Sequence, residues 1–385
     1  MELDLTWVLL ALPLAFVGGW LASRFDIRQW RMENRSAPKS YFKGLNFLLN
    51  EQQDEAIDAF IEAVQQDPDT TELHFALGNL FRSRGDYDRA VRVHQHLLQR
   101  ADLSRADHER AQHALSLDFT RAGLLDRAEA SLRLLMGTPY ESEAQVTLLA
   151  LYERTSDWPH AIEVASQLAS ANRGSFNSRI AHYHCEMAAE ASQKKQAEPA
   201  RTHLEQALAT CPESARARLA LAQWLEDDSS LTEACAQLEA LAEHTPSALP
   251  LAAMRLAKLS SRVGRQAQAQ RCLSQAQAQR PSLDYVEALA SLLPADDVAA
   301  QSALCLDHLR QEPSLVVATR WLDLQATAPS APQLPTEVAQ ALQKAITPLK
   351  RYRCAACGFE AGIHFWQCPG CQTWDSYSPR RVDDL

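Results

Sequence analysis

The chain has 385 residues and a formal net charge of −10 at pH 7, and nine of its residues are cysteines. An odd number of scattered cysteines argues against a disulfide framework and for a reducing compartment. Residues 1–35 sum to zero charge and residues 344–385 carry +2, which leaves −12 for the residues between them. Because an acidic surface repels phosphate backbones, we exclude nucleic acid as a partner.

The first predicted element is a membrane anchor, residues 1–23. The chain is uncharged from Leu5 to Ala22, and Trp7 and Trp20 bracket this run. Eighteen helical residues span about 27 Å, close to the thickness of a bilayer core, and tryptophan favours the membrane interface. A cleaved signal peptide is the main alternative, but it needs a positive start where this chain has Glu2 and Asp4. A buried soluble helix is the other alternative.

A basic juxtamembrane segment, residues 24–40, follows the predicted anchor. Its arginines are spaced four, three and four residues apart, which places Arg24, Arg28, Arg31 and Arg35 on one face of a helix. Positive charge after a span indicates the cytoplasmic side. We therefore expect a single-pass membrane protein with the bulk of the chain in the cytoplasm. Whether the arginines also contact anionic membrane lipid, or only set the topology, is left open by the sequence.

Residues 41–348 repeat with a period near 34, which is the period of tetratricopeptide (TPR) repeats. Gly44 and Gly78 are 34 residues apart, and so are Ala56 and Ala90. Further alanines follow at spacings of 38, 33, 39, 34 and 35, at Ala128, Ala161, Ala200, Ala234 and Ala269. Small residues at these positions let two antiparallel helices approach closely. Prolines recur where the second helix of a repeat should end, at Pro68, Pro212, Pro246, Pro281 and Pro313.

The pattern predicts an all-α solenoid of about seven to nine repeats, the last degenerate. Seven units run to Pro281, an eighth to Pro313, and an irregular helical remainder to Pro348. The two long spacings predict insertions in loops between helices, one near Leu103 to His108. Solenoids of this class bind polypeptides on a concave face. The sequence leaves the contact residues and a homodimer undecided.

The array contains no pattern that indicates catalysis. It lacks a phosphate-binding glycine loop, a nucleophile elbow and an HExxH motif. His182, His184 and Cys185 stand close in sequence, but residues one and two positions apart point in different directions on a helix, so the three side chains do not converge. We therefore predict that the chain is not an enzyme.

Four cysteines in residues 349–385 predict a metal site. Cys354-x2-Cys357 and Cys368-x2-Cys371 form two CxxC pairs, and two such pairs can surround one tetrahedral ion. Four sulfur ligands suit one zinc or iron ion. A closed four-cysteine site leaves no open position for a substrate, so we expect a structural role rather than catalysis.

The residues around the cysteines support further expectations. His364 is expected in loop packing or solvent rather than as a ligand. The two tryptophans Trp366 and Trp374 either form a hydrophobic shell or bind a partner. Basic residues could compensate the charge of the site: Lys350, Arg351, Arg353, Arg380 and Arg381. The short connection from Pro348 to Cys354 predicts that this domain docks on the last helices.

The whole chain resembles the lipopolysaccharide assembly protein B family of Gram-negative bacteria. The stretches that carry the resemblance are FLLNEQQDEAIDAF, LGNLFRSRGDYDRAVRVHQ, IAHYHCE and the metal run YRCAACGF…WQCPGCQTW. The resemblance implies an inner-membrane adaptor that promotes proteolysis of the lipid A-committing deacetylase by the membrane AAA+ protease. It also implies other lipopolysaccharide assembly proteins as partners, and a rubredoxin-like domain with Cys354, Cys357, Cys368 and Cys371 as ligands.

Two other functions fit the same residues. The metal run also resembles rubredoxins, which implies an electron carrier if the ion is iron. The anchor and solenoid would equally suit a membrane-tethered scaffold for another envelope complex.

Overall fold

The computed structural model describes residues 16–17, 19–20, 39–66, 70–171, 173–326 and 335–384. The predicted anchor and basic segment therefore lie almost entirely outside the described residues, including all four of their arginines (Arg24, Arg28, Arg31 and Arg35). Within the described ranges, no helix combines the length and the apolar character needed to cross a membrane.

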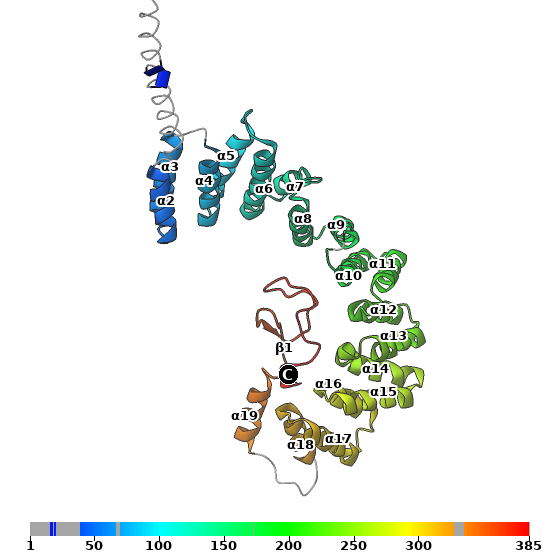
Figure 1. The fold of residues 1–385 in the computed structure, drawn as a ribbon. Coiled ribbons are helices and arrows are strands. Elements are labelled where there is room, and N and C mark those ends of the chain that lie inside the picture. The colour runs from blue at the N-terminus through cyan, green and yellow to red at the C-terminus, as the bar shows by residue number, and fades with distance from the viewer. Residues whose placement is uncertain are drawn as a thin grey trace, which may run out of the picture. The chain divides into compact units, whose positions relative to one another are not determined.

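The chain divides into two compact units, Met1–Thr155 and Ser156–Leu385. In the first unit, successive helices pack against each other in chain order from α2 to α8 (Figure 1). Their bounds are α2 Lys39–Leu49, α3 Gln53–Gln66, α4 Thr71–Arg84, α5 Tyr87–Leu98, α6 Arg105–Ala122, α7 Leu125–Arg133 and α8 Glu141–Thr155.

The second unit continues the helical pattern and ends in a small domain that contains its only two described strands. Its helices are α9 Trp158–Ser170, α10 Asn177–Gln193, α11 Ala197–Thr210, α12 Ala215–Asp227, α13 Leu231–His244, η1 Pro246–Ala248, α14 Leu249–Val263, α15 Gln266–Gln279, α16 Leu283–Leu292, α17 Val298–Gln311, α18 Leu315–Ala326 and α19 Thr336–Ile346. Strands β1 Tyr352–Arg353 and β2 Glu360–Ala361 pair antiparallel, and η2 Val382–Asp384 follows them.

The repeat pattern holds at the level of single side chains. All seven spaced alanines are fully buried: Ala56, Ala90, Ala128, Ala161, Ala200, Ala234 and Ala269. Each lies in the first turn of an odd-numbered helix, where a larger side chain would hold the helices apart. Pro212, Pro246, Pro281 and Pro313 each stand one or two residues after such a helix ends. The prediction of an all-α repeat fold is confirmed.

The prediction that the two long spacings reflect loop insertions is wrong. Most of the extra length lies in α6 and α10, which have 18 and 17 residues where α4 has 14. The physical reason is that about 3.6 residues complete one helical turn. An insertion of one turn keeps the buried face of the helix in register with its neighbours.

A buried polar cluster links three helices of the first unit. His94 of α5 and Asp118 of α6 are both fully buried, with His94 Nδ1 and Asp118 Oδ2 2.5 Å apart. Arg82 of α4 donates to Asp118 Oδ1 at 2.9 Å. The His94 ring lies against Gly78, where an added Cβ would come within 2.5 Å of Nε2. Glycine is therefore required here so that the imidazole can fit between α4 and α5.

We expect Gly78→Ala to lower the free energy of unfolding by about 1–3 kcal/mol, because the new methyl group overpacks the buried ring. This loss should exceed the roughly 1 kcal/mol that alanine contributes to helix propensity. Urea denaturation followed by circular dichroism measures the change. Gln95→Ala, at an exposed position of α5, is the control and should leave stability within about 0.5 kcal/mol. Equal stability of the two variants would contradict the packing argument.

Candidate metal centre

Two turns with the same backbone pattern present the four cysteines. In the first, the Gly358 N–H donates to Cys354 O and the Cys354 N–H donates to Phe359 O. The second repeats both bonds fourteen residues later, from Gln372 to Cys368 and from Cys368 to Thr373. Strands β1 and β2 pair on either side of the first turn, and an isolated bridge from Gln367 to Trp374 closes the second. A further bridge from Cys354 to Tyr377 connects the two, so the short segment is held by backbone pairing rather than by a large core.

The fifth residue of each turn has a left-handed backbone. Gly358 has φ 78° and Gln372 has φ 59°. Glycine adopts this conformation without steric cost, whereas the Cβ of glutamine makes it unfavourable by about 1–2 kcal/mol. The second turn is thus the more strained of the two.

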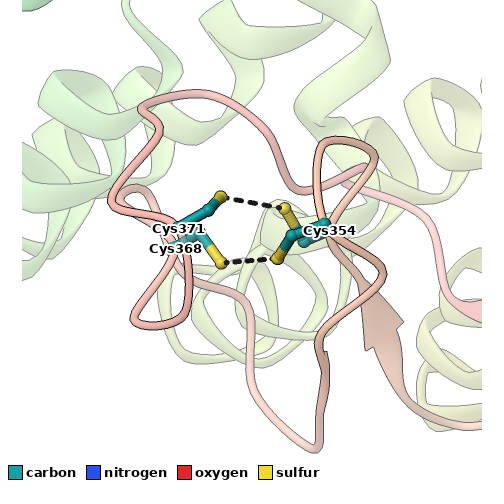
Figure 2. Close-up of side chains that lie close together, drawn as sticks. Cys354, Cys368 and Cys371 are labelled. Atoms are coloured by element: carbon teal, nitrogen blue, oxygen red, sulfur yellow. Dashed lines mark hydrogen bonds between the residues drawn. The ribbon is translucent and has the colours of Figure 1, made fainter. Parts of the chain in front are cut away.

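The four thiols form one compact group. Cys354 Sγ lies 3.8 Å from Cys371 Sγ, and Cys357 Sγ lies 3.6 Å from Cys368 Sγ (Figure 2). All four sulfurs lie within 4.8 Å of one another. Zn–S bonds of about 2.3 Å in a tetrahedron require sulfurs about 3.8 Å apart. The arrangement therefore fits one tetrahedral zinc or iron ion.

The thiols differ in exposure and in proton affinity. Cys354 and Cys368 are buried, whereas Cys357 and Cys371 are exposed. A hydrogen bond with the Ser376 hydroxyl lowers the pKa of Cys354 to about 6. The backbone N–H of Phe359 favours the Cys357 thiolate, but partial desolvation of the sulfur and the neighbouring thiols outweigh it and raise the pKa of Cys357 to about 12. Four thiolates repel one another, so full deprotonation needs a cation between them.

His364 packs in the domain and does not join the thiol group, as predicted. Its ring stands edge-on to Tyr352, Trp366 and Tyr377, with centroids 4.7–6.0 Å away. Burial lowers the pKa of His364 to about 4, so the ring is neutral at pH 7.

The prediction that the flanking basic residues compensate the thiol cluster is not what their contacts show. Arg353 pairs with Glu360 of β2 at 2.7 Å. Arg380 and Arg381 reach out of the domain, to Glu312 at 3.3 Å and to Asp284 at 2.8 Å. Their charges are used to attach the domain to α16 and α17.

One attachment of the domain is to α10, through the residues that follow the second turn. Asp375 accepts hydrogen bonds from Ser178 Oγ and His182 Nε2, both at 2.8 Å. Burial acts against the charged form, but these two bonds outweigh it and lower the pKa of Asp375. Trp374 stacks on the His182 ring, with centroids 4.8 Å apart, and meets Trp158 edge-on at 6.5 Å.

A second attachment is the C-terminal tail, which caps α16. Asp384 is 2% exposed and accepts from Ser282 Oγ at 2.7 Å and from the Leu283 N–H at 3.1 Å. A carboxylate at a helix N-terminus accepts hydrogen bonds from the free N–H groups there and interacts favourably with the positive end of the helix dipole. Asp383 accepts a hydrogen bond from the Ser314 hydroxyl before α18, and Ser314 in turn accepts from the Val317 N–H of that helix. The domain thus docks on the last helices, as predicted, and also on α10, which was not predicted.

Comparison with known proteins decides the family. Residues 352–379 match the family described as the rubredoxin metal binding domain. Lipopolysaccharide assembly protein B of Escherichia coli (strain K12) is 30% identical over 383 residues, which cover 98% of each chain.

This chain belongs to the lipopolysaccharide assembly protein B family. The Haemophilus influenzae protein of the same name is 29% identical over 385 residues, covering 96% of this chain and 97% of that one. A solved tetratricopeptide repeat protein from Parabacteroides merdae matches 67% of this chain and all of its own, at 15% identity and a TM-score of 0.33. That likeness is too loose to add to the repeat architecture that the helices here define.

The thiol group of this family member was predictable from its sequence, whereas the residues that dock the metal domain were not. His182 belongs to a cluster that was set aside as non-catalytic, and its role is to hold Asp375. The two interpretations of Trp366 and Trp374 are replaced by a third, since both rings pack against helices of the same chain. His182 and Asp375 are 193 residues apart, and no local motif in a single sequence indicates that two such distant residues are in contact.

We expect Gln372→Gly to stabilise the metal domain by about 0.5–1 kcal/mol, because glycine relieves the left-handed backbone of the second turn. Gly358→Ala should destabilise the first turn by about 1–2 kcal/mol for the same reason. Chelator competition for the bound metal, followed by thermal unfolding, measures both. Gly362→Ala is the control, since Gly362 has neither a positive φ nor an atom within 4 Å of an added Cβ. A destabilising Gln372→Gly, or a Gly358→Ala variant as stable as the unaltered chain, would contradict the strain assignment.

Asp375→Ala should lower the free energy of unfolding of the second unit by about 0.5–1.5 kcal/mol, because it removes the acceptor of His182 Nε2 and Ser178 Oγ at a half-exposed position that water can reach. Urea titration read by tryptophan fluorescence follows the change, since Trp366 and Trp374 lie in the interface. Asp307→Ala removes an exposed carboxylate that pairs with Arg310 on the same helix, and should have little effect. An unchanged midpoint for Asp375→Ala would show that the α10 contact does not hold the domain.

Proposed function

We propose that this protein is an inner-membrane adaptor that regulates lipopolysaccharide biosynthesis. In this function it promotes proteolysis of the lipid A-committing deacetylase by the membrane AAA+ protease. The observation that carries the proposal is the alignment with lipopolysaccharide assembly protein B over 98% of both chains. An alignment of that extent includes the predicted anchor, the repeat array and the four-cysteine domain together. The adaptor acts by binding and placing other proteins, not by catalysing a reaction.

The domains divide this work. Residues 1–23 anchor the chain, and residues 24–40 place Arg24, Arg28, Arg31 and Arg35 beside anionic lipid on the cytoplasmic side. The repeat array of residues 41–348 binds the deacetylase and other lipopolysaccharide assembly proteins. Holding client and protease at one membrane raises their effective concentration, which promotes turnover without any new chemistry.

The four-cysteine domain, residues 349–385, acts as a structural clasp. Cys354, Cys357, Cys368 and Cys371 would hold one zinc or iron ion, in keeping with their sulfur spacing. Such ions contribute about 10–16 kcal/mol of apparent folding free energy to small domains. Because Trp374 and Asp375 follow the second turn directly, the ion would also fix the surface that docks on α10.

Deleting the gene tests the function. We expect the deacetylase to accumulate several-fold, and the full chain to restore its normal level, as measured by immunoblot after blocking new synthesis. A chain with Cys354→Ser and Cys357→Ser should fail, because the docking surface loses its support. Cys272→Ser, outside the thiol group, should restore turnover as well as the unaltered chain does. Unchanged deacetylase in the deletion strain would instead favour a scaffold for another envelope complex.

The identity of the metal separates the adaptor from the electron carrier. Exposure of Cys357 and Cys371 is the observation that favours electron transfer, because it brings two ligands to the surface. We expect one zinc per chain by elemental analysis and no visible thiolate-to-iron absorption in the purified protein. Stoichiometric iron with a reversible colour change on reduction would support the electron carrier.

A further inference from the structure

A hollow of about 260 Å³ lies beside the start of α14, where α15 ends and α16 begins. The C-terminal tail closes one side of it through Arg380. Its walls are lined by Pro246, Ser247, Pro250, Ala276, Gln279, Arg280, Tyr285 and Arg380. It lies outside the thiol group and shares no residue with it.

Two arginines give this hollow a positive charge within an acidic segment. Arg280 is exposed and, among the described residues, forms no ion pair. Arg380 Nη2 donates a hydrogen bond to the Pro281 carbonyl and lies 3.3 Å from a carboxylate oxygen of Glu312. Its Nε is buried without an acceptor in the described part of the chain. A buried N–H without an acceptor is costly, so a ligand oxygen here would be favoured.

The remaining walls add one buried donor and an apolar floor. Tyr285 is 3% exposed, and burial raises the pKa of its phenol, so the hydroxyl keeps its proton and can donate. Pro246, Pro250 and Ala276 offer no side-chain hydrogen bond. Guanidinium groups beside a hydroxyl donor match a planar oxyanion, which arginine binds in a bidentate manner.

A second hollow, of about 310 Å³, adjoins the first and shares Ser247 with it. It runs between α10, the start of α12 and the metal domain, whose Trp366 and Tyr377 line it. Its charged lining residues are Arg216, Glu213 and Asp375, so it suits uncharged side chains better than further carboxylates. A ligand with its anionic group at Arg280 would thus find further room along the helices. An extended chain uses such room, whereas a free ion does not.

We propose that the hollow at Arg280 and Arg380 binds a single carboxylate of a polypeptide segment, whose neighbouring uncharged residues lie in the adjoining hollow. This deepens the adaptor function proposed above and rests on it for the source of the polypeptide. Arg280 supplies the accessible charge, Arg380 the oriented guanidinium and Tyr285 a neutral donor. Nucleic acids and other long polyanions are disfavoured by the net charge of the surrounding segment.

Fluorescence anisotropy with the full-length protein in an uncharged detergent tests the site. The probe is a fluorescein-labelled hexapeptide with one glutamate among alanines, compared with its glutamine analogue. We expect saturable, salt-sensitive binding of the glutamate peptide and at least tenfold weaker binding of the analogue. Arg280→Gln should weaken binding about tenfold, and Tyr285→Phe, which removes only a hydroxyl group, about threefold.

Arg271→Gln is the matched control, because Arg271 is an exposed arginine of the same helix that does not line the hollow. Equal binding by the Arg280→Gln and Arg271→Gln variants would overturn the proposal, and so would equal binding of the two peptides. Binding of inorganic phosphate without the peptide would also overturn it, since the site would then serve a free anion. The peptide titration tests the binding site, and deacetylase turnover tests the adaptor function. Either hypothesis can therefore be contradicted without the other.

Discussion

The metal domain depends on its docking against the helices, because it is too small to stand alone. Its strands are two residues each, and its buried hydrophobic cluster has four members. A domain of this size cannot bury enough apolar surface to offset its chain entropy. Two further sources would support it, a metal ion held by the thiol group and the helices of the array. The helices support the domain through hydrogen bonds, from α10 to Asp375 and from the start of α16 to Asp384, so this support is polar and directional.

This arrangement couples the proposed metal to the array. The turn at Cys368 and Cys371 leads within four residues to Trp374 and Asp375, which contact α10. A change in the geometry of the turn would therefore move the residues that dock. The tail on the other side of the domain ends in the caps of α16 and α18. The domain is held at both ends, and the hollow beside Arg380 exists because the tail is held there.

Both apolar packing and polar contacts determine how neighbouring helices of the array fit together. The seven buried alanines set the distance between helices, and they tolerate no larger side chain without displacement. The cluster of His94, Asp118 and Arg82 adds a directional contact that apolar packing lacks. Buried polar groups of this kind are costly when unpaired, so they favour one register of α4, α5 and α6 over its neighbours.

The features that depend on local spacing could be predicted from the sequence alone. Periodic alanines and prolines indicated the helices, because helix pairing has a fixed geometric period, and the two CxxC pairs indicated the thiol group, because ligand spacing is local. Even so, it misplaced the insertions, since a loop and an extra helical turn lengthen the repeat equally. Only the tertiary structure decided what the domain docks on. The partners Asp375 and His182 are 193 residues apart, and contacts at that separation leave no periodic trace in one chain. The same holds for the hollow at Arg280, whose walls come from three helices and the tail.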